Sequence, residues 1–169
     1  LETRLANIEG RGEITIRHLF KNTLHMRPDR ILVGEVRGEE AFDVLQAMNT
    51  GHDGSMTTLH ANGPMDALDR FSLLALMTRY DISDVTVERQ VASALNLIVH
   101  MERLGDGSRR VLNISEVCPN PARREDALQE LFSFAAPQRI LRPTGRIPRF
   151  AEQLASRGIA IPPELLRPS

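Results

Sequence analysis

The feature that most constrains the fold is a short apolar segment, residues 30–35, followed by a helical pattern and a second strand-like segment. Its β-branched residues and bounded length favour a strand that is buried on both faces. Two glutamates open a helical pattern over residues 39–49, and Gly51 is a natural stop. Residues 55–60 form the next candidate strand. Strand, helix and strand in this order predict a βαβ unit and a parallel sheet covered by helices.

Further helices are expected on both sides of this unit. Residues 5–13 carry two glycines and predict a loop. Thr15 is placed to cap the helix that follows, and Pro28 ends that helix because the residue before a proline avoids the helical region. A third helix is expected over residues 62–77, and Asp84 is expected to cap a fourth. The apolar face of the fourth helix would consist of Val87, Val91 and Leu95.

The hydrophobic period changes near residue 97, and the rest of the chain predicts a hairpin, a further strand and a short helix. The expected ranges are strands at 97–103 and 109–117 joined by a turn at 105–108, a loop at 119–126, a strand at 128–134 and a helix at 149–157. Apart from that helix, the chain from Pro137 is expected to be irregular. We therefore expect a first domain over residues 1–118 and a carboxyl-terminal extension over residues 119–169.

Composition excludes several classes of protein. The 169 residues have a formal net charge of −1, so overall charge gives no case for a nucleic-acid partner. The single cysteine, Cys118, excludes an internal disulfide and a cysteine-rich zinc site. No apolar run approaches the roughly 18 residues that span a bilayer, and the first residues do not have the pattern of an export signal.

The only lysine, Lys21, excludes a phosphate-binding P-loop within these residues. Such a loop needs the pattern Gly-x-x-x-x-Gly-Lys-Ser/Thr, whereas Lys21 follows Phe20 and precedes Asn22. The chain also opens without a methionine, and residues 1–4 have the character of a strand that is already under way. We therefore expect an amino-terminal truncation.

Two polar side chains mark the carboxyl ends of the two predicted parallel strands. Glu35 ends the first strand and His60 ends the second. Ligands of such sheets bind beyond the carboxyl ends of the strands, so the two side chains predict one site. A carboxylate at Glu35 can orient or deprotonate a water, or help to hold Mg²⁺ through water. The alternative is a strand-end carboxylate that pairs with Arg37.

The segment from residue 50 to residue 62 contains groups that suit a phosphate ligand. Its glycines give the backbone freedom near a ligand, and the imidazoles of His52 and His60 can donate to phosphate oxygens. One alternative is a Gly-rich turn before an ordinary strand, with His60 satisfied by the backbone. Another is a zinc site, which no tight ligand spacing supports; its ligands would be His52, Asp53 and His60, with Glu35.

Other basic residues have surface interpretations. His18 and His25 lie seven residues apart and are expected on one solvated helix face. Arg27 and Arg30 bracket a turn, where they can reach a phosphate across a subunit boundary or pair with carboxylates, and we favour the pairing. Four arginines near the carboxyl end predict a solvated segment, with docking on an acidic partner or an anionic lipid face as the alternative; they are Arg139, Arg142, Arg146 and Arg149.

Two segments resemble motifs of bacterial secretion ATPases. Residues 26–38, MRPDRILVGEVRG, are similar to the Walker B region of those proteins. The second segment, MNTGHDGS at 48–55 continuing to HAN at 60–62, is similar to their His box. The resemblance is to the CpaF-like branch, the motors of Tad/Flp pilus assembly, within the type II/type IV secretion ATPase superfamily. Further similarity to this branch lies in residues 1–4, 8–13, 94–101 and 141–145.

This resemblance implies an α/β fold, the carboxyl-terminal portion of a RecA-like P-loop ATPase core. It implies that Glu35 is the catalytic Walker B glutamate, which orients the attacking water and supports Mg²⁺. Gly34, Arg37, His52 and His60 would then be nucleotide-binding or phosphate-sensing residues. Of these, His60 would approach the γ-phosphate and Arg37 would stabilise the adjacent loop. His25 departs from the family pattern, which has arginine at this position.

The resemblance also implies ATP and Mg²⁺ as cofactors and a homo-hexamer with ATP between neighbouring subunits. The partners would be inner-membrane pilus or secretion platform proteins, with no nucleic acid, and the location would be cytoplasmic, peripheral to the inner membrane. Because these residues lack a P-loop, the isolated polypeptide is expected neither to bind nor to hydrolyse ATP appreciably. Two alternatives stay open: a non-catalytic module that docks into such a ring, and a metal-dependent hydrolase.

Overall fold

The computed structural model describes residues 1–77 and 82–168, in two compact units. Unit 1 comprises Leu1–Ala61 and Ala67–Ala94, and unit 2 comprises Asn62–Asp66 and the chain from Leu95 onward. Among the described residues, no helix has the length and apolar character needed to cross a bilayer.

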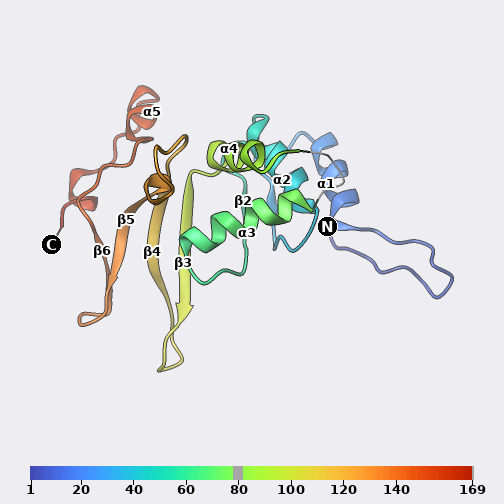
Figure 1. The fold of residues 1–169 in the computed structure, drawn as a ribbon, viewed down its shortest axis with the longest axis horizontal. Helices are drawn as coiled ribbons and strands as arrows, with labels where there is room; N and C mark the ends of the chain where they lie inside the picture. Colours follow the sequence, from blue (N-terminus) through green and yellow to red (C-terminus); the bar gives the residue numbers. More distant parts are fainter. Residues whose placement is uncertain (78–81, 169) are drawn as a thin grey trace. The chain divides into compact units, whose positions relative to one another are not determined.

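Unit 1 contains the predicted βαβ arrangement (Figure 1). Its elements are α1 (Ile16–His25), β1 (Leu32–Val33), α2 (Glu40–Asn49), β2 (Met56–Thr57), α3 (Pro64–Leu76) from Ala67 on, and α4 (Asp84–Ala94). The two strands pair in parallel, with Leu32 opposite Met56 and Val33 opposite Thr57. The parallel pairing is therefore confirmed, although both strands are shorter than predicted.

The prediction that the first strand is buried on both faces is wrong. Ile31 is only 5% exposed, whereas Leu32 is 68% exposed and its strand partner Met56 is 60% exposed. Successive strand residues point to opposite faces of a sheet. One face of the β1–β2 pair therefore packs into the core, and the face with Leu32 and Met56 is open within the described part of the chain.

The start of α1 is the capping box of a helix N-terminus. Thr15 Oγ1 accepts the His18 N–H at 3.2 Å, and His18 Nδ1 accepts the Thr15 N–H at 3.3 Å. The predicted cap is therefore confirmed, and the exposed His18 also takes part in it. At the other end the helix stops at His25, and Arg27 adopts a φ of 51° before Pro28. The break before the proline is as predicted, with Arg27 in the left-handed region.

The cap of α4 lies one residue earlier than predicted. Asp84 is already helical, and Ser83 Oγ accepts the Thr86 N–H at 3.4 Å. The predicted apolar face is confirmed at Val87 and Val91, which are 0% and 2% exposed.

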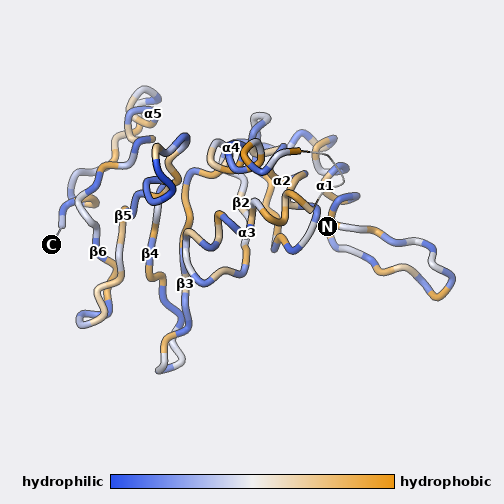
Figure 2. Tube along the Cα trace, in the orientation of Figure 1, coloured by the Kyte–Doolittle hydropathy of each residue, from blue (hydrophilic) through white to orange (hydrophobic). Residues whose placement is uncertain are grey.

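The core of unit 1 lies between its helices and the short sheet. Both hydrophobic and hydrophilic residues occur along α2 (Figure 2). Leu45 in this helix is fully buried. Gln46 Nε2 donates to Gln90 Oε1 at 3.0 Å, which ties α2 to α4. The buried apolar residues of this unit are Phe20, Ile31, Val36, Ala41, Val44, Leu45, Ala47, Leu68, Phe71, Leu74, Ala75, Val87 and Val91.

Unit 2 is built on an antiparallel sheet of four strands in the order β3-β4-β5-β6. Its elements from Leu95 on are β3 (Leu97–Arg103), β4 (Arg109–Val117), η1 (Arg124–Ala127), β5 (Leu128–Ala135), β6 (Ile140–Pro143), α5 (Ala151–Ser156) and η2 (Pro163–Leu165). The predicted hairpin, the strand from Leu128 and the short helix are confirmed. The domain boundary predicted after residue 118 falls between the neighbouring strands β4 and β5, whereas the compact units divide between Ala94 and Leu95.

The prediction of irregular chain from Pro137 is wrong for β6. This strand pairs with β5, with Arg142 opposite Ser133 and Leu141 opposite Phe134. Arg139 turns the chain between the two strands with a φ of 55°. Strand formation here depends on the edge that β5 offers, which a local pattern does not reveal.

A buried carboxylate anchors the chain after β6. Glu116, in β4, is only 3% exposed. Its Oε2 accepts the Arg149 N–H at 2.9 Å and its Oε1 accepts the Phe150 N–H at 3.2 Å. These two N–H groups precede α5, so the carboxylate satisfies donors at the start of that helix.

An ion pair joins the two hairpin turns of unit 2. Arg139, between β5 and β6, pairs with Asp106, between β3 and β4. The Arg139 guanidinium and the two hydrogen bonds from Ser108 lower the pKa of Asp106. The arginine segment predicted to be solvated is thus partly engaged: Arg139 is paired and Arg142 is half-buried, while Arg146 and Arg149 are exposed.

Candidate functional site

The two side chains predicted to share a site lie side by side. Glu35 follows β1 and His60 follows β2, and His60 Nε2 is 3.1 Å from Glu35 Oε1. The guanidinium of Arg37 is 2.5 Å from Glu35 Oε2. From the sequence, a site shared by Glu35 and His60 and an ion pair between Glu35 and Arg37 were alternatives. Both contacts are present.

The three side chains differ strongly in exposure. The Glu35 side chain is 22% exposed, whereas those of Arg37 and His60 are 75% and 84% exposed. A largely buried carboxylate is therefore flanked by two donors that are exposed to solvent. These donors can turn toward an incoming anion without disturbing the core.

Glu35 is held in its charged form. The hydrogen bond and charge of Arg37 lower the pKa of Glu35 below its ordinary value of 4.5 despite partial burial, and the charges of His60 and Arg70 add to this. A carboxylate with a lowered pKa is a weak base. The geometry therefore suits orienting a water or attracting a cation better than removing a proton.

Thr58 holds the backbone on both sides of Glu35. Its Oγ1 donates to the Gly34 carbonyl at 2.6 Å, and its carbonyl accepts the Val36 N–H at 3.0 Å. A local sequence pattern gives no partner for this hydroxyl, because Gly34 lies 24 residues away. Val36 itself is buried at 1% exposure, which fixes this turn of the chain to the core.

Glu40 fixes the loop that follows Glu35. Its Oε1 accepts the Arg37 N–H at 2.7 Å and the Gly38 N–H at 3.0 Å. From the sequence, the glutamates at this position indicated only the start of a helix. The signal that could have revealed the contact is an acidic residue in the first turn of a helix that follows a glycine loop.

His52 contacts the carboxyl-terminal part of α2. Its Nδ1 is 3.3 Å from the Ala47 carbonyl, at the end of α2. Ser55 Oγ donates to the His52 carbonyl at 2.7 Å and accepts the Ile31 N–H at 3.1 Å, which ties this loop to the start of β1. These contacts hold His52 in the loop between α2 and β2. Its phosphate-sensing role stays a prediction.

The residues considered for zinc are not gathered into a metal site. In the part of the chain that the structure describes, no group of three or more His, Cys, Asp or Glu side chains could hold a metal ion.

Arg30 does not form the ion pair with a carboxylate that the sequence favoured. Neither it nor Arg27 has an ion-pair partner within residues 1–77 and 82–168, and the Arg30 side chain lies over Gly54, 2.8 Å from where a Cβ would be.

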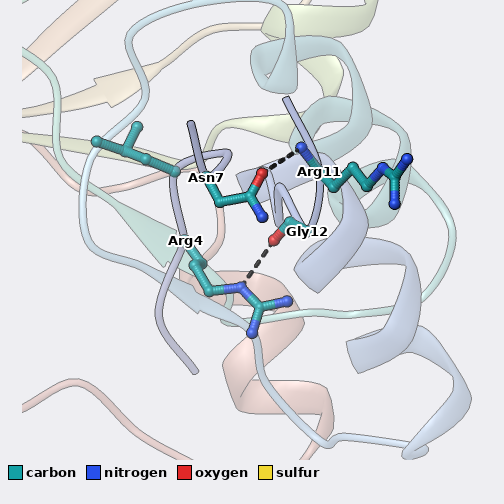
Figure 3. A pocket seen from close by; sticks show the side chains of 5 residues that line it. Arg4, Asn7, Arg11 and Gly12 are labelled. Atoms are coloured by element: carbon teal, nitrogen blue, oxygen red, sulfur yellow. Dashed lines mark hydrogen bonds between the residues drawn. The ribbon is translucent and has the colours of Figure 1, made fainter. Parts of the chain in front are cut away.

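A separate hollow of about 320 Å³ lies in the amino-terminal loop (Figure 3). Arg4 Nε donates to the Gly12 carbonyl at 2.7 Å, and the Arg11 N–H donates to Asn7 Oδ1 at 2.8 Å. These contacts give the loop its own internal order. None of the predicted site residues lines the hollow, whose walls are Arg4, Leu5, Asn7, Arg11 and Gly12.

Comparison with known proteins decides the family. Residues 2–137 match the family model described as Type II/IV secretion system protein. The chain belongs to this family. Proteins similar to this chain include the putative conjugal transfer protein Rv3659c of Mycobacterium tuberculosis, which is 44% identical over 115 residues, or 68% of this chain and 32% of the relative. They also include protein VirB11 of Agrobacterium fabrum, 36% identical over 102 residues, or 59% of this chain and 30% of the relative.

A solved structure of the same type II/IV secretion group has a similar fold. The VirB11 ATPase from the Brucella suis type IV secretion system, crystallised with sulphate, aligns with a TM-score of 0.58 and 29% identity, covering 61% of this chain and 32% of that one. The predicted α/β fold class, the carboxyl-terminal portion of an ATPase core, is confirmed. The chain spans about a third of the length of the curated relatives named above.

Proposed function

We propose that these residues form the water-orienting half of the ATP site of a secretion motor. The observation that carries this proposal is the position of the Glu35 carboxyl between Arg37 and His60, at the carboxyl ends of two parallel strands. Ligands of parallel sheets bind at that edge. Membership of the type II/IV secretion family and similarity to a VirB11 ATPase support the reaction class.

In this proposal Glu35 orients the water that attacks the γ-phosphate, and His60 donates to a γ-phosphate oxygen. Both oxygens of Glu35 are already engaged, one by Arg37 and one by His60. When the exposed His60 turns toward a phosphate, it releases Oε1 for a water. Arg37 keeps the carboxylate charged and in place, while Gly34 and His52 shape the loops on either side.

The residues also fit Mg²⁺ bound through water. Protein sites hold this ion with one or two carboxylates and the substrate phosphates, and several waters remain bound to it. Glu35 is a single carboxylate, charged and 22% exposed, which suits such an outer contact. When bound, Mg²⁺ would neutralise the charge that develops on the phosphate oxygens.

The remaining elements of the site come from outside these 169 residues. A P-loop supplies the backbone N–H groups and the lysine that hold a triphosphate, and the sequence contains no such pattern. We propose that the residues act within a homo-hexameric ring, with ATP between subunits, on the cytoplasmic side of the inner membrane and against platform proteins of the secretion system. A non-catalytic module that docks into such a ring is the second candidate.

The branch of the family is a separate proposal. The segments at residues 26–38 and 48–62 resemble Tad/Flp pilus motors, whereas the relatives identified by comparison include proteins named for conjugal transfer. We infer a role in pilus assembly or in a related type IV secretion process. The genes that neighbour this one decide between them, since pilus genes or conjugation genes would lie nearby.

A chimera tests the enzymatic proposal. These residues would replace the matching third of the Agrobacterium VirB11 protein, so that the remainder of that protein supplies the rest of the site. Release of phosphate from ATP would be measured for the chimera, for the chimera with Glu35→Gln, and for the 169-residue chain alone. We expect turnover by the chimera, a loss of about 100-fold or more with Glu35→Gln, and no turnover by the chain alone.

The matched control is Glu88→Gln in the chimera, the same change at an exposed glutamate of α4, which should keep normal turnover. A folded chimera whose turnover survives Glu35→Gln would contradict the catalytic role. A folded chimera without turnover that assembles with the parent protein would favour the docking module.

A further inference from the structure

We propose that Thr58 is a positioning residue that sets the direction of the Glu35 side chain toward His60. The proposal goes beyond the assignment of Glu35 and His60, and its catalytic consequence rests on the proposed function. The claim that Thr58 sets the direction of the Glu35 side chain is argued from the contacts of Thr58 alone.

Thr58 engages both peptide planes that meet at Glu35. The Gly34 carbonyl belongs to the plane before Glu35, and the Thr58 hydroxyl donates to it at 2.6 Å. The Val36 N–H belongs to the plane after Glu35, and it donates to the Thr58 carbonyl at 3.0 Å. A peptide unit is planar, so only two backbone angles at Glu35 can vary. Fixing both planes fixes these angles and hence the direction in which the side chain leaves the backbone.

The need for such a clamp follows from Gly34. A glycine restricts its own backbone less than any other residue, and a Cβ built at this position would meet nothing within 4 Å. Neither side-chain bulk nor packing at Gly34 therefore holds the plane before Glu35. The short hydroxyl contact from Thr58 supplies that restraint, and Thr58 lies only two residues before His60.

The neighbouring Thr57 gives a matched control. Its Oγ1 lies 3.4 Å from the Thr58 carbonyl, a weak contact, and its backbone pairs with Val33 in the β1–β2 ladder. Replacement of either threonine by valine removes one hydroxyl and keeps the β-branched shape. Only the change at Thr58 removes a restraint from the backbone beside Glu35.

The first test follows the Glu35 side-chain carboxyl by ¹³C NMR during a pH titration of the 169-residue chain. Arg37 and His60 lower the pKa of Glu35 only while the side chain points at them. We expect a midpoint below 4.5 in the wild type, with Thr58→Ser and Thr57→Val unchanged. Thr58→Val should move the midpoint toward 4.5 and weaken the cross-peak between Glu35 and the His60 ring. A Thr58→Val chain with wild-type midpoint, cross-peak and melting temperature would overturn the proposal.

If Thr58→Val does not fold, the wild-type chain still gives a test. A coupling across the hydrogen bond between the Val36 nitrogen and the Thr58 carbonyl carbon, together with a slowly exchanging Thr58 hydroxyl proton, is expected. The absence of both would overturn the proposal.

The second test uses the VirB11 chimera. Thr58→Val should lower kcat by about 10- to 100-fold, because small misplacements of reacting groups have costs of this size, while KM for ATP changes little and Thr58→Ser restores kcat. If Glu35→Gln abolishes turnover and Thr58→Val does not, the positioning role fails and the proposed function stands. If Glu35→Gln leaves turnover intact, the proposed function fails and the NMR result alone decides the role of Thr58.

Discussion

At the residue scale, the central feature is a carboxylate whose charge is fixed by its neighbours. The Arg37 guanidinium, 2.5 Å from Glu35, is the main cause of the lowered pKa, and His60 contributes through its charge. The pKa of Glu35 in the folded chain lies below the ordinary 4.5. Ionised Glu35 therefore stabilises the folded state at pH values above the pKa that Glu35 has in the unfolded chain. This stabilisation is lost as the pH falls through the pKa of the folded chain.

We predict that Arg37→Gln raises the pKa of Glu35 toward 4.5. The change removes the hydrogen bond and the nearest positive charge, while partial burial of the carboxyl remains. The ¹³C resonance of the Glu35 carboxyl, followed from pH 7 to pH 2, measures the midpoint. Arg89→Gln, an exposed arginine in α4 of the same unit, is the control and should leave the midpoint unchanged. An unchanged midpoint in Arg37→Gln would show that Arg37 does not set the charge state.

The sequence predicted the meeting of Glu35 and His60 because parallel strands bring their carboxyl ends to one edge. It could not predict the clamp at Thr58, which lies 24 residues from its Gly34 partner. Nor could it place His52, because the course of a Gly-rich loop depends on contacts such as Ser55 to Ile31. Side chains that act through hydrogen bonds to distant backbone leave no periodic signal.

At the element scale, helices were easier to predict than strand lengths. Thr15 caps α1 as expected, since a cap is a local contact. The strand at Leu32 is only two residues long and lies open on one face, because its burial depends on what covers the sheet. The strand β6 was missed because it exists through pairing with β5.

We predict that Glu116→Ala loosens α5 and lowers the free energy of unfolding by about 2 kcal/mol, the scale expected when buried backbone donors lose their acceptor. The carboxylate accepts the N–H groups of Arg149 and Phe150. Amide exchange at these two residues should become much faster, and urea unfolding gives the free-energy change. Glu164→Ala, at an exposed glutamate in η2, is the control. Unchanged exchange at both amides would show that the carboxylate does not anchor this segment.

At the scale of the whole molecule, the proposed function makes these residues one part of a larger ATP site. They carry the Glu35 carboxylate and the His60 donor, and the sequence contains no P-loop pattern. Most of the binding energy for a triphosphate comes from such a loop. The family and fold were predictable because the segments around Glu35 and His60 resemble the family over many consecutive residues. The branch stays a prediction, since the match is to a family model that covers type II and type IV secretion together.

The most direct measurement is a crystal structure of the VirB11 chimera with Mg²⁺ and a slowly hydrolysed ATP analogue. We predict that a water lies within hydrogen-bond reach of Glu35, about 2.6–3.2 Å, and faces the γ-phosphorus, with the His60 ring turned from Glu35 toward a γ-phosphate oxygen. A structure in which the nucleotide is bound but Glu35 and His60 lie on the opposite edge of the sheet from its phosphates would contradict the account.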